Sequence, residues 1–323
     1  MKKLIAIFAL TATLVGCDKQ HNGSGLDITI DGAIETPICV SIDETRAAGV
    51  DSAEGIFEHG ILDSDDITMR YILQIYINGQ IATRYVEYSD TKSVEFLPTL
   101  IPGHDYKFVV WADVVTKDSA ATTFSDVDNH YNTADLSNIT LKGDWVPMDE
   151  TRDAFTGYAV ENDFVGDHNV TVTLTRPFAK LRIVATDKAK ANTTPVRGIV
   201  KYISDFSVGF DAVAGSAKEL TSSAKVHEYT LDTYSEDTNE SYTLFTDYIF
   251  ANDNDISLTF AFYEEGASYP IMNKTYAADN VSIKCNCLTT IKGEVLTGGE
   301  VIVVTAAIES GYYGYDGVGV EVD

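Results

Sequence analysis

The sequence has 323 residues and a formal net charge of −26 at pH 7, with 49 Asp and Glu residues against 23 Lys and Arg. A chain this acidic repels nucleic acid, so we exclude DNA and RNA as partners. Hydrophobic residues make up 45% of the chain, which supports packed cores and excludes wholesale disorder. The length predicts about two domains.

The first 17 residues predict a secretory signal that ends in a bacterial lipobox. Met1–Lys3 is a short basic segment, and Leu4–Gly16 is an apolar run too short to span a bilayer, which needs about 20 residues. In the lipobox Leu14–Cys17 the cysteine becomes diacylated and is the first mature residue; an ordinary signal peptide with a chance cysteine is the alternative. Two acyl chains anchor stably, so we expect Cys17 to hold the protein at a membrane. The polar residues 18–26 then form a flexible tether.

Strand patterns dominate the rest of the chain. Apolar residues alternate in Ile38–Ile42, in Val170–Leu174 and in Leu258–Phe262, and residues 70–88 predict a hairpin closed by Asn78-Gly79. Helical periodicity is weak, with residues 132–138 and 212–220 as the best candidates for short helices. Many short strands separated by Gly, Asn and Asp turns predict an all-β fold of two tandem β-sandwich domains with few short helices. We place these domains at residues 27–175 and 176–323.

Motifs of catalysis and metal binding are scarce. The sequence contains no His-Glu-x-x-His, no Gly-x-Ser-x-Gly and no phosphate-binding Gly-rich loop. Two groups, Asp126/Asp128/His130 and Asn252–Asp255, have calcium-binding side chains, but neither completes the loop pattern and solvated turns are the favoured interpretation. We therefore expect no catalysis, no cofactor and no metal site.

Three cysteines follow Cys17, at positions 39, 285 and 287. One disulfide with one remaining thiol is an open alternative in an exported protein. Buried apolar thiols are the favoured interpretation, with the Cys285 and Cys287 sulfurs on one face of a strand.

Five stretches in a fixed order resemble the fimbrillin-like lipoproteins of Bacteroidia, the superfamily that supplies subunits of type V fimbriae. The likeness covers nearly the whole mature chain, and its order matters more than any single piece. The stretches are Thr45-Arg46-Ala47, Ile101–Asp113 with its Trp111-Ala112-Asp113 ending, Arg152–Gly157, Thr173–Leu181 with Arg176-Pro177-Phe178, and Thr289–Gly293.

The resemblance implies two transthyretin-like β-sandwiches and assembly by strand exchange. In fimbrial members an Arg-specific protease removes the N-terminal segment with the first strand, and a strand from the next subunit fills the groove. Carried over, the cleavage site is Arg46-Ala47, the removed strand is Ile28–Ile42, and the donor strand is the C-terminal alternation Val318/Val320/Val322. An ordinary loop arginine is the alternative for Arg46. A closing strand of the second sandwich is the alternative for the C-terminal residues.

Together these features predict a structural surface lipoprotein that serves as a fimbrial subunit, with other fimbrial subunits as partners. We expect a lipid-anchored location at the outer membrane or cell surface, and in a fimbrium after cleavage. The alternative is a monomeric surface lipoprotein that binds a glycan or a host protein. Its aromatic patch would include Trp145 or Tyr312, Tyr313 and Tyr315, although a core position is favoured for Trp145.

Overall fold

The computed structural model describes residues 32–43, 57, 62, 66–117, 128–166, 168–221, 225–231, 241–252 and 254–306. Strands form nearly all of its regular structure, and its named helices are short 3-10 turns at Glu150–Arg152, Lys188–Lys190 and Ile271–Asn273. This confirms the predicted all-β class of sandwich domains with few short helices. No helix in the described ranges is long and apolar enough to cross a membrane.

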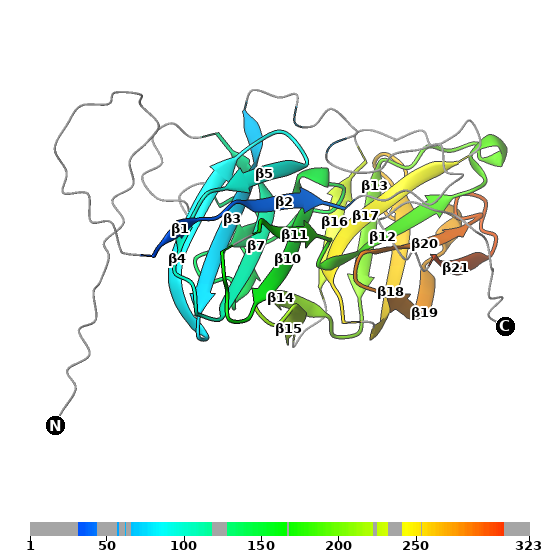
Figure 1. Ribbon diagram of the computed structural model, residues 1–323. Coiled ribbons are helices and arrows are strands. Elements are labelled where there is room, and N and C mark those ends of the chain that lie inside the picture. Colours follow the sequence, from blue (N-terminus) through cyan, green and yellow to red (C-terminus); the bar gives the residue numbers. More distant parts are fainter. Residues whose placement is uncertain are drawn as a thin grey trace.

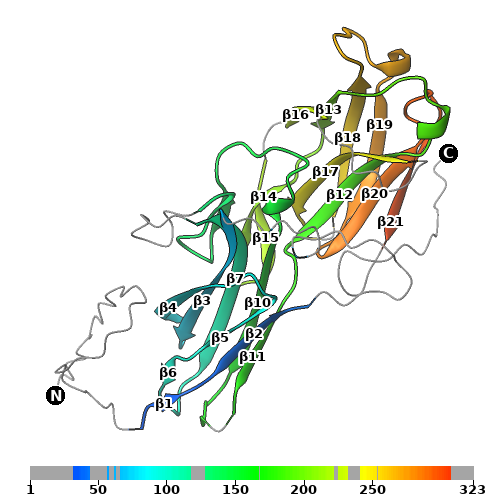
Figure 2. The same cartoon turned by 90° about the horizontal axis from the view of Figure 1, so that it is seen from above.

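The first half of the chain forms a sandwich of two sheets (Figures 1 and 2). One sheet has the order β10 (Ala154–Glu161), β7 (Tyr106–Thr116), β3 (Ile67–Ile77) and β4 (Gln80–Tyr88). The facing sheet has the order β11 (Val170–Leu174), β2 (Ile38–Ile42) and β5 (Ser93–Phe96). A separate pair joins β1 (Ile34–Glu35) to β6 (Thr99–Leu100).

The second half forms another sandwich next to the first, and two short strands from the first half of the chain extend its larger sheet (Figure 2). One sheet has the order β16 (Val226–Thr230), β13 (Arg197–Tyr202), β18 (Asn254–Tyr263) and β19 (Tyr276–Ile283). The other has the order β21 (Val301–Ala306), β20 (Cys287–Gly293), β12 (Phe178–Ala185), β17 (Tyr242–Phe250), β14 (Ser207–Asp211), β9 (Ile139–Leu141) and β8 (Tyr131–Asn132), with β15 (Ser216–Leu220) paired to β14.

The two sandwiches repeat one strand topology. The order β10-β7-β3-β4 corresponds to β19-β18-β13-β16, and the order β11-β2-β5 corresponds to β20-β12-β17. Pairing directions also agree: β2 is parallel to β11 and antiparallel to β5, as β12 is parallel to β20 and antiparallel to β17. Strand β2 in the first sandwich is therefore the counterpart of β12 in the second.

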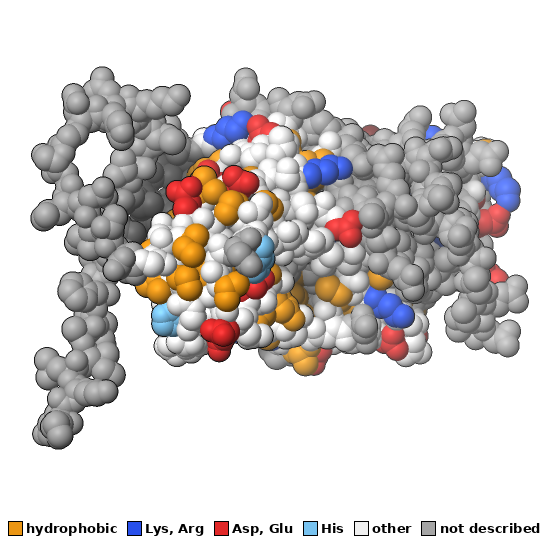
Figure 3. Space-filling model, viewed as in Figure 1, with side chains coloured by type: hydrophobic (Ala, Val, Ile, Leu, Met, Phe, Trp, Pro, Cys, Tyr) orange, Lys and Arg blue, Asp and Glu red, His pale blue; other side chains and the backbone are white. Residues whose placement is uncertain are grey.

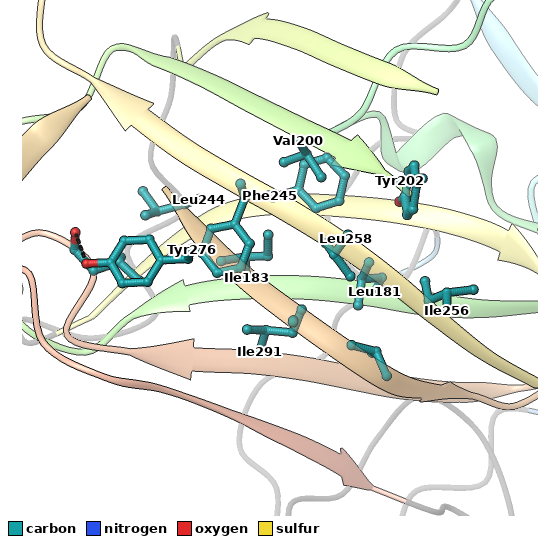
Figure 4. Packing of buried hydrophobic residues seen from close by; sticks show 14 of the residues in the cluster. Leu181, Ile183, Val200, Tyr202, Leu244, Phe245, Ile256, Leu258, Tyr276 and Ile291 are labelled. Atoms are coloured by element: carbon teal, nitrogen blue, oxygen red, sulfur yellow. Dashed lines mark hydrogen bonds between the residues drawn. The ribbon is translucent and has the colours of Figure 1, made fainter. Parts of the chain in front are cut away.

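Each sandwich has its own hydrophobic core. One cluster draws its buried residues from positions 38–174, and another draws them from positions 179–296. Figure 4 shows the second core, where Leu181 and Ile183 of β12 meet Val200, Leu258 and Phe245 from neighbouring strands. The proposed boundary between residues 175 and 176 falls between these two clusters.

A third cluster joins the halves of the chain. Trp111 of β7 packs against Tyr131 and Phe210, and Phe178 stacks on Tyr131. This packing covers the outer face of β3 and β7, so both faces of β3 are buried and its sequence lacks a simple apolar–polar alternation.

The hairpin predicted for residues 70–88 is confirmed, with β3 and β4 joined at Asn78 and Gly79. Both turn residues have positive φ, at 49° and 77°, which is the geometry that an Asn-Gly turn favours.

The two predicted short helices are wrong. Residues 133–138 form turns in which the Asp135 carboxylate accepts from the Ser137 amide and hydroxyl, a local bond that competes with a helix. Residues 216–220 are β15, because burial of Phe210 and Ala217 in the third cluster outweighs weak helix propensity.

Candidate strand-exchange site

Strand β2 is the middle strand of its sheet. Ile38, Val40 and Ile42 lie opposite Val170, Val172 and Leu174 of the parallel neighbour β11. On the antiparallel side, Ile38 lies opposite Phe96 and Val40 opposite Val94 of β5. A strand in this position completes the backbone hydrogen bonds of both neighbours.

The inward face of β2 belongs to the first core. Ile38, Val40 and Ile42 are 0%, 1% and 7% exposed, and the alternating residues Cys39 and Ser41 point outward. Burying a Val or Ile side chain contributes about 1.5–3 kcal/mol, so the three together contribute about 5–9 kcal/mol. Removal of β2 would open an apolar groove and two sheet edges.

The outward face of β2 carries small polar groups. Cys39, Ser41, Ser93, Glu95 and Thr171 line a shallow depression together with Val40 and Val94. The Cys39 thiol lies 3.8 Å from a Glu95 carboxylate oxygen, and its partial burial together with Glu95 raises the pKa of the thiol. A thiol held protonated is a poor nucleophile, so we assign this depression no chemistry.

The predicted cleavage site follows β2 closely. Pairing with β11 continues to Asp43, whose amide donates to the Leu174 carbonyl at 3.0 Å. Arg46 comes three residues later. Because β3 begins at Ile67, a cut after Arg46 would leave β1 and β2 joined to the rest only by non-covalent contacts. Cys17, Arg46, Ala47, Val318, Val320 and Val322 lie outside the described residues.

Two of the stretches that carry the fimbrillin-like resemblance, Arg152–Gly157 and Thr173–Leu181, contribute buried pairs to the junction of the two sandwiches. Arg176, between β11 and β12, is bidentate to Asp153 at 2.8 and 2.7 Å, and both side chains are buried. Arg152 is buried against Asp247 of β17 and donates to the Tyr248 carbonyl at 2.9 Å. These Arg and Asp residues are therefore structural, and sequence spacing gave no sign that they meet.

Lys180 of β12 extends the same junction. Its ammonium lies 2.8 Å from the Glu150 carboxylate, which also accepts from the Tyr248 hydroxyl at 2.5 Å. Since Glu150 comes just before β10, this pair also ties the second sandwich to the first.

Trp145 packs against the second core, as favoured from the sequence. Its indole nitrogen donates to Asp247 at 3.1 Å, and its ring lies edge-on to His227. The tyrosines at 312, 313 and 315 lie outside the described residues.

The described calcium candidates take up structural contacts, and Asp126 and Asp253 lie outside the described residues. Asp128 pairs with the buried Arg70 at 2.7 Å, and Arg70 is also bidentate to Asp113. Asn252 exchanges two hydrogen bonds with the Ala217 backbone. Within the described ranges, no group of three or more His, Cys, Asp or Glu residues is arranged to hold a metal ion.

The expectation of buried thiols is wrong for two of the three cysteines. Cys287 is buried, but Cys39 is half-buried and Cys285 is exposed. Cys285 lies in the turn before β20, and Asn286 has a φ of 56°, so Cys285 and Cys287 do not share a strand face. No disulfide joins these three described cysteines to one another.

The chain belongs to the family of unknown function DUF6562, whose model matches residues 21–317. No curated protein matches this sequence.

Several solved structures from Bacteroidales resemble the fold. A Bacteroides eggerthii protein proposed to act in cell adhesion is 14% identical, with 84% of this chain and 96% of that chain covered and a TM-score of 0.48. A fimbrial assembly protein from Parabacteroides distasonis is 13% identical, with 84% and 95% covered and a TM-score of 0.46. The tip fimbrial protein Mfa3 from Porphyromonas gingivalis is 12% identical, with 84% and 98% covered and a TM-score of 0.45. These likenesses concern the fold alone.

Proposed function

We propose that this chain is a structural cell-surface lipoprotein that serves as a fimbrial subunit. In this proposal Cys17 carries the lipid that anchors the precursor at the outer membrane. Proteolysis after Arg46 then removes the anchor together with β1 and β2, and a C-terminal strand from another subunit takes the place of β2.

One observation carries the proposal. Strand β2, which completes the first core, is one of the two described strands that precede Arg46 in the chain. Ile38, Val40 and Ile42 fill a groove between β5 and β11 from a segment that a single cut would detach. An open groove with two unpaired sheet edges is a strong template for another strand. Loss of β2 therefore creates both the driving force and the specificity for subunit addition.

The C-terminal alternation suits this groove. Val318, Val320 and Val322 have the same period-two spacing as Ile38, Val40 and Ile42, so all three can face the core at once. Gly311, Gly314 and Gly317 precede them in the sequence, and glycine-rich segments are typical of flexible linkers.

The alternative, a monomeric surface protein with an aromatic binding patch, loses one of its two sequence supports. Trp145 is engaged with Asp247 and the second core instead of standing in solvent. Hydrophobic side chains do gather over the first sandwich on the face in Figure 3, but Asp and Glu side chains separate them. We therefore keep assembly as the proposed function.

The test is the intact mass and the N-terminal sequence of the protein from native cell envelopes. We expect chains that begin at Ala47 in high-mass assemblies. Arg46→Ala should leave monomers that retain β2, whereas the matched control Thr45→Ala keeps the arginine and should assemble. Wild-type chains that still begin at an acylated Cys17 and are only monomeric would refute fimbrial polymerisation.

A further inference from the structure

A short segment between β9 and β10 packs against a buried histidine. In residues 144–148, the strap, the side chains of Trp145 and Met148 contact the second core. The ring centroid of Trp145 lies 5.0 Å from that of His227 on β16, and His227 is 3% exposed. We infer that protonation of His227 releases the strap, because the imidazolium takes over the carboxylate that holds Trp145.

That carboxylate belongs to Asp247 of β17, whose side chain is fully buried. Its donors are the Trp145 indole at 3.1 and 3.2 Å, the Tyr202 hydroxyl at 2.8 Å, the Tyr248 amide at 2.9 Å and the Arg152 guanidinium. The bond from Trp145 is the longest of these and is shared between both carboxylate oxygens. It is therefore the easiest of the four to displace.

His227 is placed to displace this bond. Its Nε2 lies 3.6 Å from Asp247 Oδ2, beyond hydrogen-bond distance, and has no hydrogen-bond partner among the described residues. Protonation turns this nitrogen into a charged donor, and charge-assisted hydrogen bonds are about twice as strong as neutral ones. A small rotation of the ring brings Nε2 to the oxygen that Trp145 shares with Tyr202.

The charges around His227 favour the same outcome. Burial lowers the pKa of His227 and Asp247 opposes this effect, whereas Lys225 and Arg152 add to the lowering. Lys225 also holds the outer end of the strap, through a 2.8 Å pair with Asp144, and its ammonium lies 4.5 Å from the centroid of the strap's indole ring. Repulsion by the imidazolium therefore weakens both contacts of Lys225 with the strap.

Two further titratable groups face His227. Tyr202 of β13 lies 5.9 Å away between ring centroids, and burial raises the pKa of Tyr202, so its hydroxyl stays neutral in acid. Asp144 of the strap favours the protonated form of His227, but its side chain is 95% exposed and solvent screens this attraction.

The strap can leave while the second sandwich stays folded. The Asp144 side chain and Val146, at 62% exposure, already lie in solvent. At the other end the Met148 amide donates to the Thr246 carbonyl at 2.9 Å. Release breaks this bond, the Asp144 pair and the Trp145 contacts, whereas Arg152 remains on the carboxylate of β17. Because the open form binds the proton more tightly, the strap is closed above about pH 6.5 and opens as the pH falls below that value.

A second histidine beside the strap supplies a matched control. His130 Nε2 lies 2.8 Å from Thr151 Oγ1 and 3.7 Å from the Asp149 carboxylate, just after the strap. Burial lowers the pKa of His130 as well, with Asp149 opposing this effect. Its imidazolium would pair with Asp149 and displace no strap contact.

Hydrogen exchange of the full chain, followed by mass spectrometry from about pH 7.5 to about pH 5.5 and corrected for the intrinsic pH dependence of exchange, tests the inference. We expect protection of residues 144–148 to fall by up to about tenfold per pH unit below about pH 6.5, the limit for one linked proton. Strands β13 and β18 should keep their protection. His227→Gln should abolish the response, and His130→Gln should retain it.

Strap protection that does not change with pH overturns the inference. Simultaneous loss of protection in the strap, β13 and β18 also overturns it, because that result means global unfolding. A response that survives in His227→Gln, or disappears in His130→Gln, assigns the effect to another group and has the same consequence. The wild-type series decides the question even if a variant does not fold.

Discussion

Two matched substitutions separate a discarded strand from a retained one. Val40 of β2 and Val172 of β11 lie opposite each other, and both are buried in the first core, at 1% and 0% exposure. Changing either to Ala removes two carbon atoms from the same part of the core. If β2 is removed during maturation, only the substitution at Val172 still affects the core of the assembled subunit.

The magnitude follows from burial. Two methylene equivalents at about 0.8 kcal/mol each give about 1.6 kcal/mol, and the residual cavity raises the cost to about 2–3 kcal/mol. Before cleavage we expect Val40→Ala and Val172→Ala to lower the free energy of unfolding by similar amounts, measured by urea denaturation of the intact chain. After cleavage we expect Val172→Ala to weaken subunit assembly by about 30-fold, which corresponds to about 2 kcal/mol, and Val40→Ala to leave it unchanged.

The assay is the dissociation of assembled, cleaved protein on dilution, followed by light scattering. Equal weakening by both substitutions would show that Val40 remains in the assembled subunit and would refute strand replacement. If both uncleaved variants had the same free energy of unfolding as the wild type, the packing that the structure assigns to β2 would be refuted.

Three further substitutions test the junction and the sandwich seams. Arg176→Met should lower the free energy of unfolding by about 3–5 kcal/mol in urea denaturation, because it leaves the buried Asp153 carboxylate unpaired. Burial, together with the nearby Lys225 and Arg152, lowers the pKa of His227. The contribution of His227 to folding stability should therefore be fully present above about pH 6.5 and should decline as the pH falls below that value. Urea midpoints measured from pH 8 to pH 5 should show this decline, and the His227→Gln variant should show a smaller one. Gly157→Ala should destabilise by about 1–3 kcal/mol, because its Cβ would lie 2.2 Å from the Thr173 carbonyl oxygen; a melting temperature equal to wild type would contradict this.

Local patterns in the sequence predict local structure well. The Asn78-Gly79 turn, the alternation in Ile38–Ile42 and that in Val170–Leu174 each appear as expected, because period two and turn chemistry act over a few residues. The helix predicted to include residues 216–220 is wrong for the opposite reason, because the conformation of these residues depends on packing with distant aromatic residues. Parallel pairing of β2 with β11 joins segments about 130 residues apart and leaves no local signal.

Buried polar pairs are the other part that sequence reasoning missed. Arg70 with Asp113, and Arg152 with Asp247, are far apart in the chain, and an acidic sequence offers many equivalent partners for each arginine. Only the three-dimensional fold determines which acidic residue pairs with each arginine. Asp128 shows the consequence, because its carboxylate fits a metal-site pattern in sequence and serves as an ion-pair partner of Arg70 in the structure.

The repeated topology also explains why exchange should be confined to one sandwich. Strand β12 occupies the same place as β2, but it is fixed by buried charge pairs at the junction, with Arg176 just before it and Lys180 within it. Both pairs reach residues near the start of β10. Displacing β12 would leave the buried Asp153 carboxylate without Arg176, at about 3–5 kcal/mol, and would also break the partly buried pair of Lys180 with Glu150. The described side chains of β2 contribute apolar contacts and small polar groups, which another strand can reproduce. Under the proposed function, the strand that is replaced would therefore be β2 of the first sandwich, and the charge pairs of the second sandwich would hold β12 in place during that replacement.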